Sequence, residues 1–295
     1  MNPSVAVIIP TFNNKARLRT ALEHWKKVQY DNFTIIVVND GCSDGTKEMV
    51  EKEYPNIVQL FADGNQFFAG SCNIGLQYAI DNGFDYATVF NDDNYVEPGL
   101  LAAQVECAQQ HPNSVLAARS YKLRTNKVIW AVGGVVTKRI IGIGITWLGK
   151  DTEDDGKTYE EPFPVDALDG SSQFYPLHIV KAIGFWDVRY KMSFADVEYS
   201  VRAKKKGFQL ISNPRAIVWH DYEESETIQK KKKNYKFKLL YLLFNQKSSF
   251  NVVNMFRFWF TYFPAQAIPT IIRYYANMLK RHYYDIHVKG KKEFR

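Results

Sequence analysis

The segment YATVFNDDN (residues 86–94) decides the fold, because an apolar run that is typical of a buried strand ends directly in two adjacent carboxylates. Asp92 and Asp93 repel each other, and burying either carboxylate without a partner costs free energy. A turn or a helix cap needs one acceptor and gains nothing from a second negative charge beside it. We therefore expect a positive group to lie beside Asp92 and Asp93.

The chain on either side of this segment alternates apolar, strand-like runs with helical periodicity. Strands are predicted at residues 5–10, 33–38, 57–62, 86–90 and 114–118, and helices at residues 15–28, 44–53, 69–82 and 98–110. Beyond residue 122 the pattern predicts a helix near residues 194–206 and two short strands at 208–212 and 216–219. Apolar strands separated by helices predict an α/β fold, with a mostly parallel sheet covered by helices on both faces.

Four predicted strands end in polar residues, which would form one polar rim at the carboxyl ends of the sheet, where such sheets bind ligands. These residues are 11–14, 39–41, 63–65 and 91–93. A divalent cation would account for the paired carboxylates, since Mg²⁺ or Mn²⁺ is commonly held by one or two carboxylates, phosphate oxygens and water. Neither the dinucleotide-binding glycine pattern nor the P-loop lysine motif follows the first strand. The sequence thus favours a nucleotide whose diphosphate is held through a metal ion.

Six ordered motifs resemble those of glycosyltransferase family 2, whose members are inverting enzymes with a Rossmann-like GT-A fold. The motifs are PTFNN (10–14), VVNDGCSDGT (37–46), NQFFAGSCNIG (65–75), FNDDN (90–94), LDGSSQF (168–174) and FADVEYSVRAKKKG (194–207). The similarity covers roughly residues 4 to 222, and FNDDN is most similar to rhamnosyltransferase-like bacterial members that build surface polysaccharides. The resemblance to the family implies transfer of a sugar from a dTDP- or UDP-linked donor to a glycan or lipid-linked acceptor. The resemblance to the rhamnosyltransferase-like members implies that this sugar is rhamnose.

The resemblance also implies which residues bind the donor. Thr11 and Asp40 match positions that contact the base and ribose, and Asn65, Gly70 and Asn73 match a second donor-binding segment in which Phe67 replaces the usual glycine. Asn13 and Asp92 are expected to face the donor as well. The donor-binding set is therefore Thr11, Asn13, Asp40, Asn65, Gly70, Asn73 and Asp92.

The metal and the base follow from the same resemblance. Asp93 takes the principal position of the family's Asp-X-Asp metal motif, which reads Asn91-Asp92-Asp93 here, and His220 is expected to complete an Mn²⁺ or Mg²⁺ site. Asp196 matches the catalytic base, which must take the proton of the attacking hydroxyl on the side opposite the departing diphosphate. Without the resemblance, a plain N-cap would describe Asp196 equally well.

Three residues are assigned to the acceptor side. Asp169 and Gly170 match a segment that often lines the acceptor site, although a plain turn describes them nearly as well. Trp186 is expected to stack on a sugar, and a core aromatic near a helix end is the alternative. The lone His220 has a similar alternative as a structural residue.

The charge of the chain is uneven and predicts a second region. The net charge of the 295 residues is +7, and residues 222–295 hold fifteen Lys or Arg against five Asp or Glu, together with seventeen of the 44 aromatic residues. We predict a GT-A catalytic domain over residues 1–222 and a basic, aromatic, helical region over 223–295. Lys230–Lys233 and the aromatic run 256–263 would contact an anionic membrane, with a helical subdomain or a subunit interface as alternatives.

Cysteine content and the N-terminus predict the compartment. Three cysteines without metal-ligand spacing argue against a disulfide framework, and Met1–Ser4 leads directly into the first strand. We therefore expect a cytoplasmic protein on the inner face of the membrane. Two other classes stay open: a sugar nucleotidyltransferase, and a non-enzymatic nucleic-acid module built on the basic tail. The leading hypothesis predicts no nucleic-acid partner.

Overall fold

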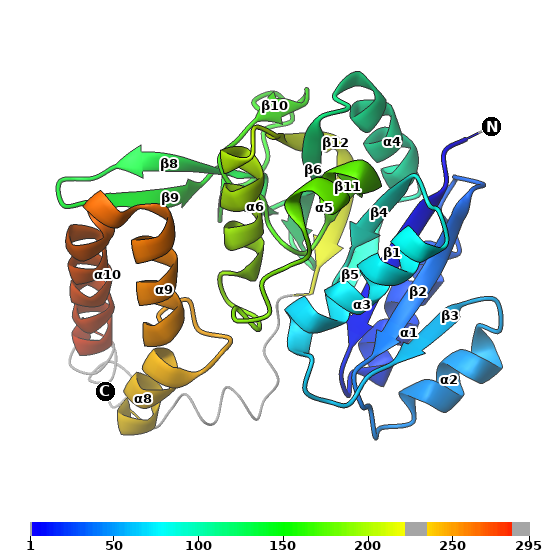
Figure 1. Ribbon diagram of the computed structural model, residues 1–295, viewed down its shortest axis with the longest axis horizontal. Helices are drawn as coiled ribbons and strands as arrows, with labels where there is room; N and C mark the ends of the chain where they lie inside the picture. The colour runs from blue at the N-terminus through cyan, green and yellow to red at the C-terminus, as the bar shows by residue number, and fades with distance from the viewer. Residues whose placement is uncertain (1, 222–234, 285–295) are drawn as a thin grey trace. The chain divides into compact units, whose positions relative to one another are not determined.

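The computed structural model describes residues 2–221 and 235–284, which divide into two compact units (Figure 1). Unit 1 comprises residues 1–135, 146–191 and 195–222. Unit 2 comprises residues 136–145, 192–194 and 223–295. Lys230–Lys233, which the sequence assigns to membrane contact, lie outside the described residues.

A mostly parallel sheet forms the centre of unit 1 and confirms the predicted α/β, GT-A type fold. Its main path runs β10-β12-β6-β11-β4-β1-β2-β3, with β5 paired to β12 and β7 paired to β6. The strands are β1 (Val5–Thr11), β2 (Phe33–Asn39), β3 (Val58–Phe61), β4 (Tyr86–Val89), β5 (Asn94–Val96), β6 (Ser114–Lys122), β7 (Ile129–Ala131), β10 (Phe163–Pro164), β11 (Gln173–Pro176) and β12 (Gln209–His220).

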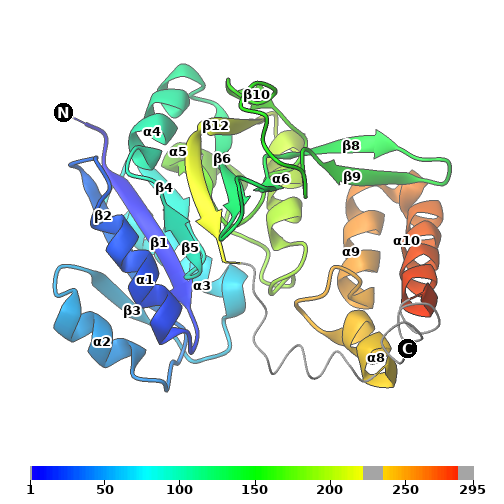
Figure 2. The ribbon, with the colours of Figure 1, turned by 180° about the vertical axis from the view of Figure 1, so that it is seen from behind.

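Helices cover both faces of this sheet, as predicted (Figures 1 and 2). One face packs against α1, α2 and α4, and the other carries α3, α5 and α6. The helices are α1 (Lys15–Trp25), α2 (Thr46–Glu53), α3 (Phe67–Asp81), α4 (Leu100–Gln110), α5 (Leu177–Ile183) and α6 (Ala195–Lys205). The first six residues of β1, Val5–Pro10, are apolar, and all seven of its residues are buried. Since successive side chains of a strand point to opposite faces of the sheet, both faces of β1 are covered.

The close approach of α3 to β1 depends on a glycine. A Cβ built on Gly75 would lie 2.3 Å from Ile8 Cγ2, far inside van der Waals contact. A larger residue at this position would push α3 away from the sheet. The end of β1 and the start of α3, which both carry predicted donor-binding residues, are therefore held close together.

The structure corrects one strand prediction and contains one strand that the sequence does not predict. The runs at 208–212 and 216–219 form one strand, β12, whose pairing with β6 is irregular between Asn213 and Ile217. The segment Gln173–Pro176, within and after the LDGSSQF motif, forms β11, which lies antiparallel between β4 and β6. Its four residues are all buried and are too few to show a strand periodicity.

Over residues 235–284, the structure of unit 2 has three helices, α8 (Tyr235–Phe244), α9 (Val252–Tyr262) and α10 (Pro264–Tyr284). Phe258 and Trp259 of α9 are buried and lie 5.2 Å apart between ring centroids, while Phe256 and Phe260 form a stacked pair that is exposed. The aromatic residues thus build a helical subdomain and also leave an apolar stripe on its surface. Across residues 2–221 and 235–284, no helix combines the length and apolar character needed to cross a membrane.

The strands β8 (Gly134–Lys138) and β9 (Ile143–Trp147) form a separate two-stranded sheet. Its turn belongs to unit 2 and packs closely on α10, where a Cβ on Gly142 would meet Thr270 at 2.4 Å from its Oγ1. Gly142 has a φ of +72°, a conformation that glycine adopts without strain.

Candidate active site

Asp92 lies at the carboxyl end of β4 and joins it to the end of β1. Its Oδ2 accepts a hydrogen bond from Thr11 Oγ1 and its Oδ1 accepts one from Asn14 Nδ2, each at 2.7 Å. Burial raises the pKa of Asp92 to about 7, and the negative charge of Asp93 adds to this rise. Asp92 therefore carries less than a full charge near neutral pH, and the two predicted donor-binding residues Thr11 and Asp92 are brought together.

The positive group that the sequence predicts beside Asp93 is Arg17. Arg17 on α1 places Nη1 3.8 Å from the Asp93 carboxylate and Nε 3.4 Å from Asp221. On the other side, His220 Nδ1 lies 3.5 Å from Asp93 Oδ1. Asp93 and His220, the two predicted metal ligands, are therefore neighbours although 127 residues separate them in the chain.

The hydrogen bonds of Asn94 determine which nitrogen of His220 carries the proton. Asn94 Nδ2 donates to the carbonyl oxygen of Ser171 at 2.7 Å, so Asn94 Oδ1 is the atom that faces His220 Nδ1, also at 2.7 Å. Nδ1–H therefore donates, and the lone pair resides on Nε2. Burial lowers the pKa of His220, which favours this neutral form.

Asp196 lies in the first turn of α6 and is fixed by two backbone amides. Its Oδ2 accepts a hydrogen bond from Gly170 N at 3.0 Å, and its Oδ1 accepts one from Val197 N at 2.8 Å. Burial raises the pKa of Asp196 to about 6, with a further rise from the negative charge of Asp169. A carboxylate with this pKa is ionised at neutral pH and is a better proton acceptor than an ordinary aspartate.

Asp169 and Gly170 connect Asp196, the candidate base, to His220, a candidate metal ligand. Asp169 Oδ1 accepts hydrogen bonds from the backbone amide and the hydroxyl of Ser171, and Ser171 in turn accepts from Asn94. A Cβ on Gly170 would lie 2.8 Å from Asp196 Cβ, so only glycine fits here without a shift. The segment 169–171 is therefore shared between Asp196 and the Asn94–His220 pair.

Asp40 is buried at the end of β2 and binds the backbone of the following loop. Its Oδ1 accepts hydrogen bonds from Gly64 N (2.9 Å) and Gln66 N (3.2 Å), and its Oδ2 accepts one from Phe67 N (2.9 Å). Phe67 has a φ of +55°, in the region that favours glycine. This bulky residue therefore holds a backbone conformation that glycine would adopt without strain.

Three further donor residues of the prediction also have contacts within the protein. Asn13 Oδ1 accepts from Ser43 N at 2.7 Å, which joins the loops after β1 and β2. The backbone amide of Asn65 donates to Asp63 Oδ1 at 3.0 Å. Gly70 on α3 faces Gln66, whose Oε1 would be 2.7 Å from an added Cβ. Asn13, Asn65 and Gly70 thus lie on the loops and the helix start that surround Asp40.

Asn73 and Trp186 contact each other. Asn73 Nδ2 donates to the Trp186 carbonyl and Asn73 Oδ1 accepts from Trp186 N, both at 2.9 Å. The Trp186 side chain is 2% exposed and stacks on Tyr199 with ring centroids 5.5 Å apart. This burial favours the core-aromatic alternative for Trp186, because neither face of its ring is open to an acceptor sugar.

The residues present fit a divalent cation that a substrate helps to hold. Among the side chains of residues 2–221 and 235–284, no group of three or more His, Cys, Asp or Glu is placed to bind a metal. Asp93 and His220 would supply two ligands, and Mg²⁺ or Mn²⁺ usually completes its shell with substrate phosphates and water. A carboxylate oxygen and a neutral imidazole nitrogen are both ligand types that Mn²⁺ accepts in proteins.

Comparison with known protein families shows which family the chain belongs to. The family model described as Glycosyl transferase family 2 matches residues 6–161, which is more than half of the sequence. The chain belongs to glycosyl transferase family 2. The matched residues include the strand ends that carry Thr11, Asp40, Asp92 and Asp93, whereas Asp196 and His220 lie beyond them.

Two curated proteins are similar to most of this chain. The poly-beta-1,6-N-acetyl-D-glucosamine synthase of Staphylococcus aureus (strain COL) is 21% identical over 73% of this chain and 49% of its own length. The dolichyl N-acetyl-alpha-D-glucosaminyl phosphate 3-beta-D-2,3-diacetamido-2,3-dideoxy-beta-D-glucuronosyltransferase of Methanococcus voltae is 22% identical over 88% of this chain and 79% of its own. The chain thus spans about half the length of the staphylococcal relative.

A solved structure supports the fold assignment. GalNAc-T7, crystallised with UDP, GalNAc and Mn²⁺, superposes with a TM-score of 0.62 and 15% sequence identity. The superposition covers 76% of this chain and 44% of GalNAc-T7. At this identity the similarity establishes the shared GT-A fold.

Sequence reasoning did not assign site roles to Arg17, Asn94 or Asp221. Arg17 lies in the first turn of α1, and no motif marks it as a partner of Asp93 and Asp221. Asn94 belongs to the FNDDN motif, but its contact with His220 depends on the pairing of β5 with β12. Asp221 directly follows His220, and its burial between Arg17 and Arg124 is a property of the folded chain.

Proposed function

We propose that this protein is an inverting glycosyltransferase that transfers a sugar from a nucleoside-diphosphate donor to an acceptor hydroxyl. The observation that carries this proposal is the arrangement around residues 169–171, which tie the base candidate Asp196 to Asn94 and so to His220 and Asp93. Family 2 membership favours this reaction over that of a sugar nucleotidyltransferase.

The donor would bind at the polar rim formed by the ends of β1, β2 and β4. Thr11, Asn13 and Asp40 would contact the base and ribose, and Asn65 and Gly70 would lie beside them. Asn73 would support this region through its two hydrogen bonds to the Trp186 backbone. GalNAc-T7 binds UDP together with Mn²⁺, which supports a nucleoside diphosphate here. We favour a dTDP- or UDP-linked sugar, and rhamnose from the resemblance of the FNDDN segment.

Asp93 and His220 Nε2 would hold Mn²⁺ or Mg²⁺ against the diphosphate. The bound ion would stabilise the negative charge that develops on the departing diphosphate. Asp92 would contribute through Thr11 and Asn14, which it orients with its two carboxylate oxygens. Arg17 would balance the charge of Asp93 and Asp221 from the opposite side.

Asp196 would act as the general base. The acceptor oxygen forms a bond to the anomeric carbon while the bond to the diphosphate oxygen breaks, and the hydroxyl proton passes to the Asp196 carboxylate. The two amides that bind Asp196 fix its orientation without neutralising it. Asp169 and Gly170 would line the acceptor site, and Trp186 would support this region from the core.

The acceptor would be a glycan or a lipid-linked saccharide of a cell-surface polysaccharide. The staphylococcal relative is named as a polysaccharide synthase, and the archaeal relative is named for a dolichyl phosphate acceptor, which supports this class. We place the protein at the cytoplasmic face of the membrane, with unit 2 in peripheral contact with anionic lipid.

A donor panel tests the proposal directly. Purified protein is mixed with UDP-, dTDP- and GDP-sugars, with Mn²⁺, Mg²⁺ or chelator, and thermal stabilisation and slow donor hydrolysis are measured. We expect one nucleotide class to stabilise the protein only with metal, and hydrolysis to disappear in Asp196→Asn. Stabilisation by no sugar nucleotide under any metal condition would contradict the proposal.

A further inference from the structure

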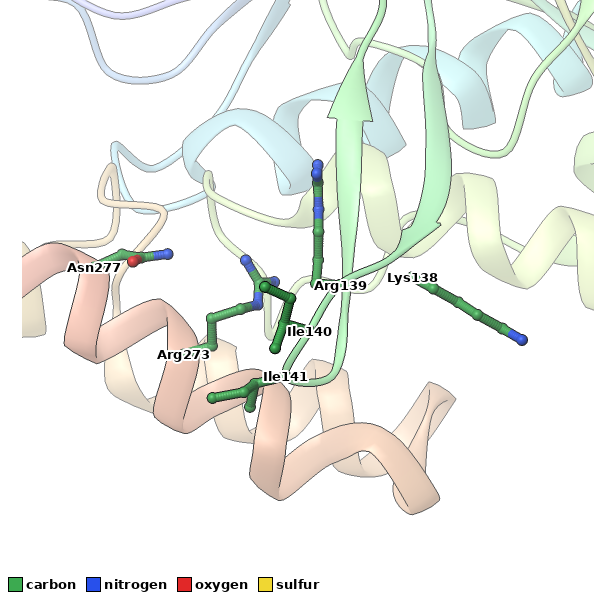
Figure 3. Close-up of a pocket in the computed structure, with 6 residues that line it drawn as sticks. All are labelled: Lys138, Arg139, Ile140, Ile141, Arg273 and Asn277. Carbon is green, nitrogen blue, oxygen red and sulfur yellow. The ribbon is translucent and has the colours of Figure 1, made fainter.

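The turn between β8 and β9 forms a groove with α10 that lies entirely within unit 2 (Figure 3). The groove has a volume of about 640 Å³ and is lined by Lys138, Arg139, Ile140, Ile141, Arg273 and Asn277. Arg273 reaches from α10 toward the turn, beside Ile140 and Ile141, and Lys138 extends from the other side of the turn. Three of the six lining side chains are cationic, and none is acidic.

Hydrogen bonds hold this turn firmly on α10. Ile143 N donates to Thr270 Oγ1 at 3.0 Å, and Arg273 Nη2 donates to the Ile143 carbonyl at 2.6 Å. The turn itself is closed by a bond from Arg139 N to the Gly142 carbonyl at 3.0 Å. Ile140 and Ile141 are therefore presented on a fixed tip, where Ile140 is fully exposed and Ile141 is about half exposed.

The charge of unit 2 indicates what this tip would contact. Residues 136–145, 192–194 and 235–284, the described part of unit 2, contain nine Lys or Arg and no Asp or Glu. These described residues therefore carry a strong net positive charge. An anionic partner is therefore favoured, and the apolar tip distinguishes a lipid surface from a nucleic acid, whose phosphates offer no apolar phase.

We propose that the β8–β9 turn is a membrane-docking site in which Ile140 and Ile141 enter the headgroup region while Lys138, Arg139 and Arg273 bind lipid phosphates. The occupant is the surface of an anionic phospholipid bilayer. This inference deepens the membrane contact proposed above and rests on it, but it assigns the contact to a segment about 80 residues before the basic tail. The amphipathic stripe of α10, with exposed Ile268, Ile272 and Leu279, belongs to the same unit.

Vesicle co-sedimentation of the full chain tests the site. Vesicles of phosphatidylcholine alone are compared with vesicles of equal parts phosphatidylcholine and phosphatidylglycerol. Lys138→Gln with Arg139→Gln should weaken binding to anionic vesicles by about 30-fold at low salt, since each cation near such a surface contributes a factor of about five. Ile140→Ser with Ile141→Ser should weaken binding about tenfold at low and high salt alike.

Matched controls remove similar groups from unit 1. Lys27→Gln with Lys52→Gln removes two exposed positive charges, and Val188→Ser removes an aliphatic side chain that is 53% exposed. Both controls should bind vesicles like the unchanged protein. Equal binding by the turn variants and the controls would overturn the proposal.

Two further measurements distinguish lipid phosphate from free phosphate and from nucleic acid. Inorganic phosphate at concentrations that saturate a soluble site should not displace the protein from anionic vesicles. Displacement of the protein from vesicles by inorganic phosphate would also overturn the assignment. So would a protein that binds duplex DNA but no vesicles, if Ile140→Ser with Ile141→Ser left its DNA binding unchanged. Sugar-nucleotide binding is measured in parallel, so that a protein that binds donor but no vesicle refutes this inference and leaves the transfer reaction standing.

Discussion

Asn94 Oδ1 lies 2.7 Å from His220 Nδ1, and the pairing of β5 with β12 places these two residues opposite each other. Since Asn94 Nδ2 is held by the Ser171 carbonyl, the amide cannot rotate without losing a second hydrogen bond. The contact therefore sets both the orientation and the tautomer of the proposed ligand. Groups that orient metal ligands in this way commonly change metal affinity by about 10–100-fold when removed.

We expect Asn94→Ala to raise the Mn²⁺ concentration needed for half-maximal donor binding by about 10–100-fold, because His220 would lose its fixed tautomer. Titration calorimetry with donor at increasing Mn²⁺ measures this. Asn213→Ala is the matched control, since Asn213 is also a fully buried amide, and it lies on β12, the strand of His220, with hydrogen bonds to Ala103 and Gln104. An equal loss of metal affinity in both variants would indicate general loosening of β12.

The two adjacent carboxylates should respond differently to the same substitution. Asp93→Asn should remove most metal-dependent donor binding, because a neutral amide is a poor ligand for a hard cation. Asp92→Asn should reduce metal affinity by less than about tenfold, because Asp92 has a pKa of about 7 and already carries less than a full charge at neutral pH.

Donor affinity with and without Mn²⁺ measures both variants. If Asp93→Asn bound donor and responded to metal like the unchanged protein, Asp93 would not be a ligand. If the losses were reversed between the two positions, the principal ligand would be Asp92.

The sequence predicts much of the fold because its signals are local. Apolar runs, helical periodicity and polar strand ends place β1, β2, β4 and the helices between them within a few residues, and the parallel order follows from their alternation. The encounter of Asp93 with His220 also follows, because both lie at strand ends on one rim. These features depend on neighbours in the chain and on general rules of α/β sheets.

The remaining features depend on contacts that no local pattern encodes. The strand β11 has four residues and lies antiparallel between β4 and β6, a position that is set by contacts between distant parts of the chain. The motif predicts a donor contact for Asn73, yet both ends of its amide bind the Trp186 backbone 113 residues away. The pairing of Arg17 with Asp93 and Asp221 is likewise invisible until the sheet forms.

The packing of α3 on β1 predicts a stability effect at Gly75. Gly75→Ala would place a Cβ 2.3 Å from Ile8 Cγ2, and relief of this overlap should lower the free energy of unfolding by about 1–3 kcal/mol. Gly99→Ala is the control, because its Cβ would have no heavy atom within 4 Å and its φ of −83° suits any residue. Urea unfolding of the two variants measures the difference, and equal stabilities would show that α3 shifts freely.

The charge of Asp169 should shift the pH dependence of transfer through Asp196. Asp196 must be ionised to accept a proton, so kcat/KM should fall tenfold per pH unit below its pKa of about 6. A negative neighbour disfavours ionisation and raises a pKa, so removing the charge in Asp169→Asn should lower the pKa of Asp196 and move the acid limb to lower pH. Asp196→Asn should lack this limb and lose about 10²–10⁴-fold in turnover.

The pH profile of kcat/KM at saturating Mn²⁺ is measured for the unchanged protein and for both variants. Asp31→Asn, on the exposed surface, is the control, and the midpoint of its acid limb should stay unchanged. An acid limb that stays in place in Asp169→Asn would mean that burial alone sets the pKa of Asp196, and a limb that persists in Asp196→Asn would assign the base to another residue.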